Sequence, residues 1–297
     1  MNRRGTLPNA HFPDLEPDIT AREISLDGER VRLVEAGDNH AFPIVLLHGW
    51  GASAYNYRGL FGPLAAAGFR VIAPDFRGHG WSDTRLARGA WTRQAMTDWV
   101  RRLLDALGVR ECVLVGQSIG GAVALDAAAA MPDRVRGVVL LAPIGFTTVR
   151  RVLLARMFPW VRFPTTPRWI VASILRDIYG TRGSWTERDL DEYWIPLRRG
   201  DVVRALLQSA REFDFTLRDP EPLRGCRIVI RFGELDGLIP HAIAMRHAGR
   251  FEGADVSVLP GVGHVPAEEV PDEVVDLICR TITLVREGRG SEARGQR

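Results

Sequence analysis

Three residues that lie far apart in this chain of 297 residues have the types needed for nucleophilic catalysis. The first is the serine of Gly116-x-Ser118-x-Gly120, which separates an apolar run at 112–115 from an alanine-rich segment at 121–131. A strand that turns straight into a helix forces its central residue into a cramped, left-handed conformation, and the flanking glycines remove β-carbons that would collide. We therefore expect Ser118 at the tip of a nucleophile elbow. The alternative, a tight packing turn, fits this strand-turn-helix context less well.

An acid and a histidine follow at the ends of later apolar runs. A serine hydroxyl needs a base to take its proton, and an imidazole works best when a carboxylate holds its tautomer. Asp236 follows the run 227–232, and His264 lies in a glycine-containing loop after the run 255–259. Glu234 is the competing acid. The order serine, acid, histidine matches one known order of such triads.

The other histidines and nearby acids have structural interpretations. Four histidines are expected at the surface or at helix ends: His11, His40, His241 and His247. His48 and His79 lie in loops where an imidazole more often ties backbone segments together. Asp75 and Asp83 precede the serine and are expected to accept structural hydrogen bonds, whereas Asp126 belongs to the elbow helix.

The composition excludes several kinds of chemistry. All 39 basic residues are arginine, so a P-loop lysine, a lysine Schiff base and a Ser-Lys dyad are ruled out. The net charge is only +3 and the arginines do not gather on one element, so we expect no nucleic-acid partner. Cys112, Cys226 and Cys279 have no metal or redox spacing and are expected to be inert thiols.

The chain also lacks the patterns of a membrane or secreted protein. Its N-terminal residues contain no apolar core of a signal peptide, and no apolar run approaches the roughly 20 residues of a membrane span. We expect a cytoplasmic protein without stable membrane insertion.

The remaining segments alternate between strand-like and helix-like patterns. A hairpin is expected around Asp27-Gly28, followed by buried strands that alternate with helices. This alternation favours a mostly parallel, doubly wound sheet. It stops between about 144 and 222, where the pattern is helical and large aromatic residues gather: Phe158, Trp160, Phe163, Trp169, Tyr179, Trp185, Tyr193 and Trp194.

On these motifs the chain resembles the α/β-hydrolase-fold superfamily, in particular its capped serine esterases and C–C hydrolases, over residues 22–286. The resemblance implies an α/β fold with an eight-stranded, mostly parallel, doubly wound sheet and a helical cap inserted after the sixth strand. The implied organisation is an N-terminal arm at 1–22, a core at 23–143 and 223–287, a helical cap at 144–222 and a disordered tail at 288–297.

The resemblance also implies roles for individual residues. The oxyanion hole would use the main-chain amides of Trp50 and Ile119, and the family pattern favours Asp236 over Glu234 as the acid. A serine at the elbow, where dehalogenases and epoxide hydrolases resembling this chain have aspartate, implies an acyl-enzyme. Val265 follows His264 where C–C hydrolases usually carry an aromatic residue, which weakens that alternative.

The sequence thus predicts a serine hydrolase that cleaves a small to medium hydrophobic carboxylic ester, as a monomer or homodimer. No metal, nucleotide or other cofactor is expected. The alternatives are a C–C bond hydrolase of acyl substrates, a cofactor-free peroxidase or acyltransferase, and a non-catalytic receptor with the same fold.

Overall fold

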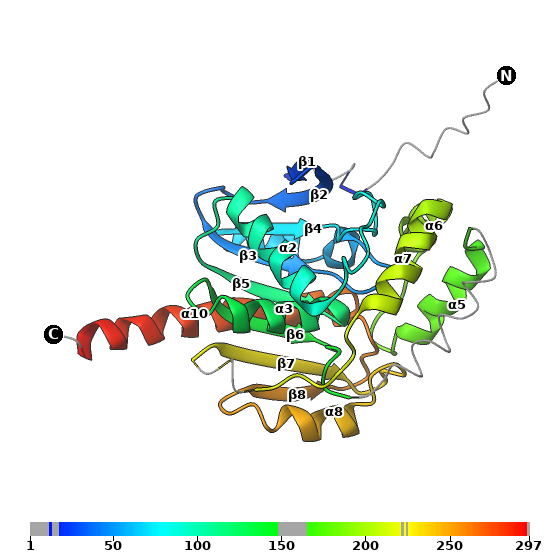
Figure 1. The fold of residues 1–297 in the computed structure, drawn as a ribbon. Coiled ribbons are helices and arrows are strands. Elements are labelled where there is room, and N and C mark those ends of the chain that lie inside the picture. The colour runs from blue at the N-terminus through cyan, green and yellow to red at the C-terminus, as the bar shows by residue number, and fades with distance from the viewer. Residues whose placement is uncertain (1–11, 14–17, 148–164, 221–222, 224, 296–297) are drawn as a thin grey trace.

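The fold is built on one eight-stranded sheet (Figure 1). The computed structural model describes residues 12–13, 18–147, 165–220, 223 and 225–295. In chain order the strands are β1 (Ile19–Leu26), β2 (Glu29–Ala36), β3 (Phe42–Leu47), β4 (Phe69–Pro74), β5 (Cys112–Gln117), β6 (Val135–Leu141), β7 (Arg227–Gly233) and β8 (Asp255–Leu259). Their spatial order is β1-β2-β4-β3-β5-β6-β7-β8. In this spatial order, each neighbouring pair from β4 through β3 to β8 is parallel. The strand β2 is antiparallel to both of its neighbours, β1 and β4. The predicted fold class is confirmed.

Local sequence explains the hairpin at the start of the sheet. Asp27 and Gly28 both have positive φ, at 52° and 84°, which matches the twist of a two-residue hairpin turn. The register of the hairpin between β1 and β2 places Leu26 opposite Glu29.

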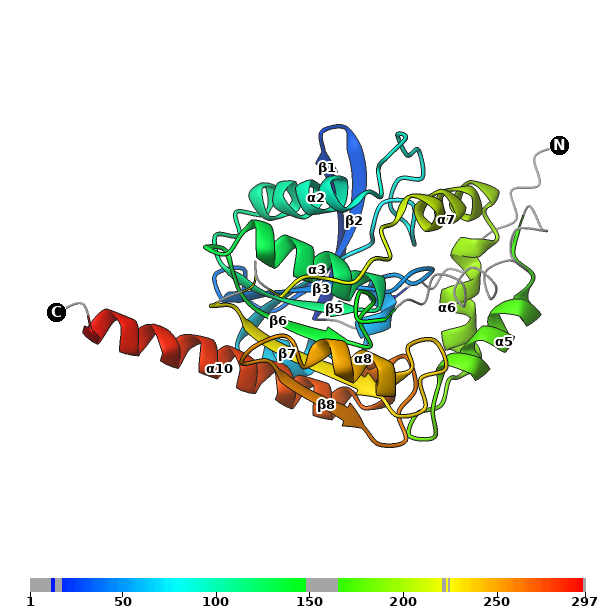
Figure 2. The same ribbon diagram turned by 60° about the horizontal axis from the view of Figure 1, so that its bottom comes forward.

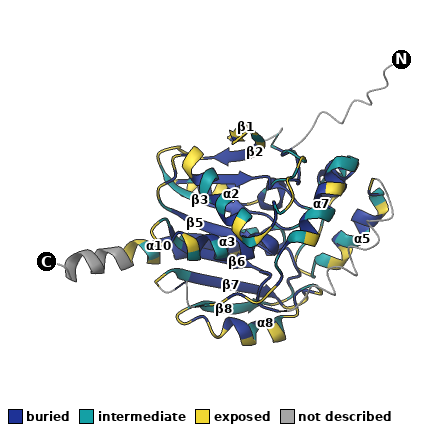
Figure 3. Cartoon of the chain, in the orientation of Figure 1, coloured by how far each residue is buried: buried dark blue, intermediate teal, exposed yellow. Residues whose placement is uncertain are grey.

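The central strands are apolar throughout because helices cover both faces of the sheet. Alternate residues of β5 enter different cores: Leu114 packs with the helices α2 (Arg93–Ala106) and α3 (Ile119–Ala130), whereas Val113 packs with α1 (Phe61–Ala66) and α10 (Pro271–Gly295). The helix α8 (His241–Ala248) contacts β7 and β8. Figure 2 shows these layers, and Figure 3 shows that burial is concentrated in the sheet between them.

Three described helices lie between β6 and β7, within the interval 144–222 that the sequence assigned to the cap. They are α5 (Arg168–Ile178), α6 (Glu187–Leu197) and α7 (Gly200–Glu212). They share a small apolar core that includes Leu175, Leu190 and Leu206. Figure 1 shows them gathered beyond one end of the strands. Residues 148–164, which include three of the expected cap aromatics, fall outside the described residues.

Several boundaries differ from the sequence-based expectation. The strand β1 begins at Ile19, inside the expected arm, because it pairs with the end of β2 at Ala36. The sequence pattern also predicts a short helix over about 56–67, where the structure has a 3-10 turn, η1 (Ala54–Tyr57), followed by α1.

The sequence pattern predicts one last helix, over about 268–286. It is split into α9 (Pro266–Glu269) and α10, because Pro271 forces the preceding residue, Val270, out of the helical conformation. The helix α10 continues to Gly295, within the tail at 288–297, and the disorder expected for that tail stays a prediction. Glycines in this tail lower helix propensity by about 1 kcal/mol each without forbidding a helix.

Two further expectations concern the membrane and the thiols. None of the helices in the described part of the chain is both long and apolar enough to cross a membrane. All three cysteines are unbonded, and burial raises the pKa of Cys112 and of Cys226 to about 12. Both of these thiols are therefore protonated and unreactive at neutral pH.

Candidate active site

The turn between β5 and α3 has the geometry of a nucleophile elbow. Ser118 stands there with φ 54° and ψ −115°, a conformation that a residue with a β-carbon rarely adopts. A β-carbon on Gly116 would lie 2.4 Å from the carbonyl oxygen of Gly120. One on Gly120 would lie 1.9 Å from the carbonyl oxygen of Leu47. Both positions therefore require glycine, and this sharp turn places Ser118 at the start of α3.

The structure brings Asp236 and His264 into direct contact, although 28 residues separate them. The Oδ2 atom of Asp236 lies 2.8 Å from Nδ1 of His264. Its other oxygen accepts hydrogen bonds from the amides of Leu238 and Ile239, at 2.8 and 2.9 Å, which fixes the carboxylate in the turn after β7. An ionised carboxylate can accept hydrogen bonds but cannot donate them. The Asp236 carboxylate therefore keeps the imidazole proton on Nδ1 and leaves Nε2 as the basic nitrogen.

The competing acid has another role. The carboxylate of Glu234 accepts a hydrogen bond from the amide of Gly261 at 2.8 Å, and it makes no described contact with His264. The structure therefore pairs the histidine with Asp236.

The loop that carries His264 is bound directly to the end of the cap helix α5. The amide of His264 donates to the carbonyl oxygen of Ile178 at 2.6 Å, and the amide of Thr181 donates to Gly261 at 2.8 Å. This approach requires Gly180, where a β-carbon would lie 2.4 Å from the carbonyl oxygen of Gly261. These main-chain hydrogen bonds with the end of α5 thus fix the position of the loop that carries His264.

A buried glutamate joins the same two segments. The two carboxylate oxygens of Glu269 accept hydrogen bonds from the amides of Gly263 and Gly180, each at 2.7 Å. Glu269 is 5% exposed, and burial raises its pKa. The sequence analysis missed this residue because an acid at the end of a short helix is common at surfaces, and nothing local shows that it is buried.

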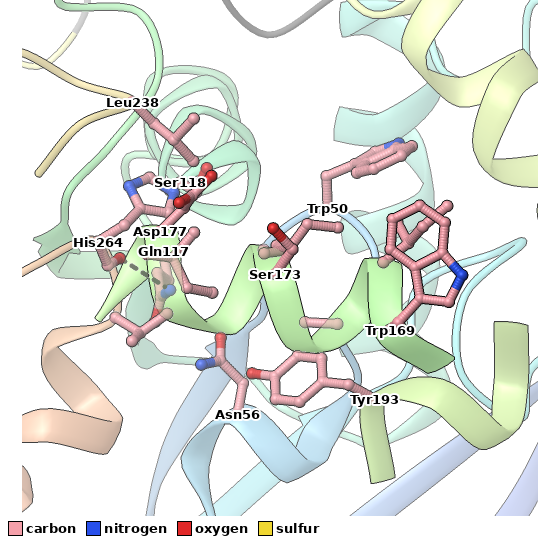
Figure 4. A pocket seen from close by; sticks show the side chains of 16 residues that line it. Trp50, Asn56, Gln117, Ser118, Trp169, Ser173, Asp177, Tyr193, Leu238 and His264 are labelled. Carbon is pink, nitrogen blue, oxygen red and sulfur yellow. Dashed lines mark hydrogen bonds between the residues drawn. The ribbon is translucent and has the colours of Figure 1, made fainter. Parts of the chain in front are cut away.

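Ser118 and His264 open onto a pocket of about 350 Å³ beneath the cap. One face of α5 forms a wall of this pocket with residues at helical spacing: Trp169, Ile170, Ser173, Ile174, Asp177 and Ile178. Figure 4 shows Ser118 and His264 at one end, with Trp169 at the other. The Trp169 side chain is 66% exposed, so it marks the mouth.

The two residues expected to supply the oxyanion amides are the neighbour of Ser118 in the chain and a residue of the pocket wall. Ile119 is the first residue of α3, where main-chain N–H groups have no acceptor within the helix. Trp50 follows the His48-Gly49 pair after β3 and lines the pocket. Its indole N–H donates to Ser209 Oγ at 3.0 Å and to the carbonyl oxygen of Leu206 at 3.2 Å, both on the cap helix α7.

The residues that were assigned structural roles make structural contacts. His48 accepts the amide N–H of Phe76 on Nε2 at 2.9 Å and places Nδ1 2.7 Å from the carbonyl oxygen of Gly49. Burial lowers the pKa of His48, so it is neutral. Asp75 accepts the amide of Ala54 at 2.7 Å. Asp126 pairs with Arg218 at 2.9 Å.

His247 differs from its expectation in one respect. It lies in the last turn of α8 but is only 9% exposed, with Nε2 2.8 Å from the carbonyl oxygen of Arg218. His11 falls outside the described residues.

A second feature that the sequence analysis missed is a buried polar cluster between the cap and the core. Glu268, whose side chain is completely inaccessible, pairs with Arg58, and Arg58 also contacts Asp189 of α6 at 2.7 Å. Glu268 further accepts hydrogen bonds from Tyr179 Oη at 2.7 Å and from Tyr193. A buried carboxylate is tolerated only with such partners, so this cluster ties the cap to α9 and η1.

The described residues contain no group of three or more histidine, cysteine, aspartate or glutamate side chains placed to hold a metal ion. The chemistry that this arrangement offers is that of a serine beside an imidazole–carboxylate pair in a largely apolar pocket.

Comparisons with known proteins identify relatives of this chain. The chain is 28% identical over 261 residues to 2-hydroxy-6-oxo-6-phenylhexa-2,4-dienoate hydrolase of Burkholderia cepacia, covering 83% of this chain and 88% of that protein. The solved structure of the hydrolase of that name from Rhodococcus sp. strain RHA1 gives a TM-score of 0.78 at 21% identity, over 89% of this chain and 99% of that one.

Carboxylesterase CesB from Bacillus subtilis gives a TM-score of 0.72 at 19% identity, over 89% of this chain and 91% of that one. At these identities the two structural matches show the shared fold alone. A family model described as the alpha/beta hydrolase family matches residues 44–277, which is well over half of the sequence. The chain therefore belongs to the alpha/beta hydrolase family.

Proposed function

We propose that this protein is a serine carboxylesterase acting on neutral, largely apolar esters. The observation that carries the proposal is the hydrogen bond between Asp236 and His264 at the edge of a pocket that also exposes Ser118. A serine, a histidine and a buried aspartate in this order are the components of acyl transfer through a covalent intermediate.

The proposed reaction proceeds in two halves. His264 Nε2 takes the proton of Ser118 as Oγ attacks the ester carbonyl, and Asp236 stabilises the imidazolium that forms. The main-chain amides of Trp50 and Ile119 hold the oxyanion, where one donor is worth about 10²–10³ in rate. His264 then protonates the departing alcohol, and the same imidazole activates the water that releases the acid.

The lining of the pocket supports a neutral ester over an acid. Most of its described side chains are apolar, one is a carboxylate, Asp177, and the only basic one is the proposed catalytic base, His264. A substrate with its own carboxylate would therefore bury a negative charge without a described cation to pair with it, which is costly.

C–C bond hydrolysis is the second candidate. The relative from Burkholderia cepacia, which aligns over 83% of this chain, is named as the hydrolase of a 6-oxo-dienoate, and that compound contains no ester bond. The same triad would serve an acyl C–C bond. That relative's named substrate is a dienoate, which carries a carboxylate. The two candidates therefore differ in the charge that the pocket must accept.

A direct comparison of two substrates tests the proposal. Steady-state hydrolysis of p-nitrophenyl butyrate is measured beside hydrolysis of 2-hydroxy-6-oxo-6-phenylhexa-2,4-dienoate, with Ser118→Ala as the control for both. The carboxylesterase proposal predicts that kcat/KM is higher for the ester and is lost in Ser118→Ala. Preferential cleavage of the dienoate would replace it with C–C hydrolysis.

A further inference from the structure

The residue that precedes Ser118 in the chain reaches His264 with its side chain. Gln117 is the last residue of β5 and is only 2% exposed. Its Nε2 group donates a hydrogen bond to the main-chain carbonyl oxygen of His264 at 3.1 Å (Figure 4). A main-chain carbonyl can only accept, so the amide must present its nitrogen there. No step of the proposed reaction uses this contact.

Packing alone does not explain a glutamine at this position. Among the described residues, Oε1 of Gln117 has no hydrogen-bond partner, and protein atoms close it off from solvent. A buried carbonyl without a partner costs free energy. A methionine of similar volume would fill the space without that unpaired oxygen. What glutamine adds here is therefore the Nε2 donor and its hydrogen bond to His264.

This hydrogen bond helps to fix the direction in which the imidazole leaves the main chain. The amide of His264 belongs to the peptide group before its α-carbon and donates to Ile178 of α5 at 2.6 Å. Its carbonyl belongs to the peptide group after the α-carbon and accepts from Gln117. Because the backbone has only two soft dihedrals per residue, holding both peptide planes fixes the Cα–Cβ bond of His264. The hydrogen bond between Nδ1 and Asp236 then sets the rotation of the ring.

The two main-chain contacts of His264 come from parts of the molecule that differ in rigidity. Ile178 belongs to the cap. Gln117 pairs with Leu141 of β6, and the other edge of β5 pairs with β3, so its side chain starts from the middle of the sheet. The Gln117 contact therefore ties the base to the strand that leads directly into Ser118.

We infer that Gln117 is a positioning residue, whose Nε2 donor holds His264 at the distance from Ser118 that proton transfer requires. The inference rests on the proposed roles of Ser118 and His264 and goes beyond them by naming the residue that keeps base and nucleophile in register. Misplacing a reacting group by about 1 Å can cost 10²-fold in rate. The Gln117 donor therefore acts on the chemical step and not on substrate binding.

Gln117→Met tests the inference, because it removes the donor at similar volume. We expect kcat for p-nitrophenyl butyrate to fall by about ten- to a hundredfold with KM nearly unchanged, and the rate at which a fluorophosphonate labels Ser118 to fall by the same factor. The midpoint of denaturant unfolding should stay near that of the wild type. The variant loses one unpaired buried acceptor, Oε1, and gains another, the carbonyl of His264.

A matched control makes the same chemical change elsewhere. Gln94 lies on α2, and its Nε2 group donates to Asp98 at 2.9 Å. Gln94→Met should leave kcat, KM, the labelling rate and the unfolding midpoint as in the wild type.

A double variant tests whether Gln117 acts through the loop of His264. Gly180→Ala places a methyl group against the main chain of Gly263 and displaces this loop from the side of the cap. Once the loop is displaced, the Gln117 donor has less to hold. The loss of kcat caused by Gln117→Met should therefore be clearly smaller in the Gly180→Ala background than in the wild type. Losses that simply multiply would overturn the action through the loop.

The other outcomes separate this inference from the proposed function. Ester turnover and labelling that Gln117→Met leaves unchanged would overturn the inference and leave the esterase standing. A loss that differs among the acetate, butyrate and octanoate esters of p-nitrophenol, or that follows a loss of stability, would assign Gln117 to substrate binding or to folding and also overturn it. Labelling of Ser118 that Gln117→Met slows, without any ester hydrolysis, would overturn the carboxylesterase proposal and support the inference.

Discussion

The elbow and the histidine loop hold the two reacting groups of the proposed triad in different ways. Ser118 is positioned by residues that lie close to it in the sequence. Gly116 and Gly120 lack β-carbons, which lets β5, α3 and the end of β3 pack directly against one another. His264 is held from a distance, by the main chain of Ile178 in the cap and by the buried carboxylate of Glu269. The first arrangement is a property of the sheet, and the second is shared between the core and the cap.

This difference has a mechanical consequence. A movement of the cap that leaves the sheet unchanged keeps Ser118 in place but pulls on the loop of His264. We therefore expect changes at the cap to affect the base far more than the nucleophile. Four substitutions test the contrast.

The largest effect is expected at the elbow. Gly120→Ala places a methyl group 1.9 Å from the backbone of Leu47, which cannot move without breaking the sheet. Because backbone cannot repack as a side chain can, we expect a loss of more than about 3 kcal/mol in the free energy of unfolding. Denaturant unfolding measures it. Gly49→Ala is the control, since its nearest neighbour would be Ser118 Cβ at an ordinary 3.6 Å; equal losses would contradict the argument.

Gly180→Ala tests the contact between the cap and the histidine loop. The new methyl group would lie 2.6 Å from the amide nitrogen of Gly263 and push the loop of His264 away. A displacement of about 1 Å can cost 10²-fold in rate, so kcat/KM should fall by about that factor, while the free energy of unfolding should fall by less than in Gly120→Ala because a loop can shift where the sheet cannot. Gly62→Ala, in open space on α1, should leave both unchanged. A stability loss as large as that of Gly120→Ala would show that the two regions are not distinct.

Glu269→Gln tests the carboxylate that spans the same contact. Glutamine has one acceptor oxygen for two amides, and a hydrogen bond to a charged group is worth about 1.5–3 kcal/mol, so we expect roughly tenfold lower kcat/KM. Glu273→Gln is the control, because Glu273 forms an exposed pair with Arg182 between the same two regions. Comparable losses in both variants would remove the special role of Glu269.

The pH dependence of the same carboxylate has a definite sign. Burial raises the pKa of Glu269, so the folded state binds its proton more tightly than the unfolded state. Acidification through that pKa therefore does not lower stability through this group, yet it converts an acceptor into a donor and loosens the histidine loop. We expect activity to fall on acidification before stability does, and the fall to be steeper in the wild type than in Glu269→Gln, because protonation of the base His264 lowers activity in both proteins and protonation of Glu269 adds to it only in the wild type. A comparison of pH–rate and pH–stability profiles measures it.

The smallest effect is expected at Trp50, whose main-chain amide belongs to the core and whose indole reaches the cap. Trp50→Phe keeps the amide but removes the hydrogen bonds to Ser209 and Leu206. Each neutral hydrogen bond contributes about 1 kcal/mol, so KM should rise a few-fold with kcat nearly unchanged. A kcat loss as large as that of Gly180→Ala would show that the indole positions the oxyanion amide itself.

The same contrast explains what could be predicted from the sequence. The glycines of the elbow and the Asp27-Gly28 turn act on their immediate neighbours, and their spacing is therefore visible in the chain. The mostly parallel, eight-stranded sheet followed from the alternation of strands and helices together with the family resemblance. Glu269 and Glu268 could not be recognised, because their burial depends on cap residues some 90 positions away, such as Gly180 and Tyr179.

The proposed mechanism depends on Ser118 as a nucleophile that His264 activates. Its most direct test is the rate at which a fluorophosphonate labels the protein, with the modified residue identified by mass spectrometry in the wild type, Ser118→Ala and His264→Ala. We predict a single adduct on Ser118, no adduct in Ser118→Ala, and labelling slowed by several orders of magnitude in His264→Ala. An adduct on another residue, or labelling of Ser118 that does not depend on His264, would contradict it.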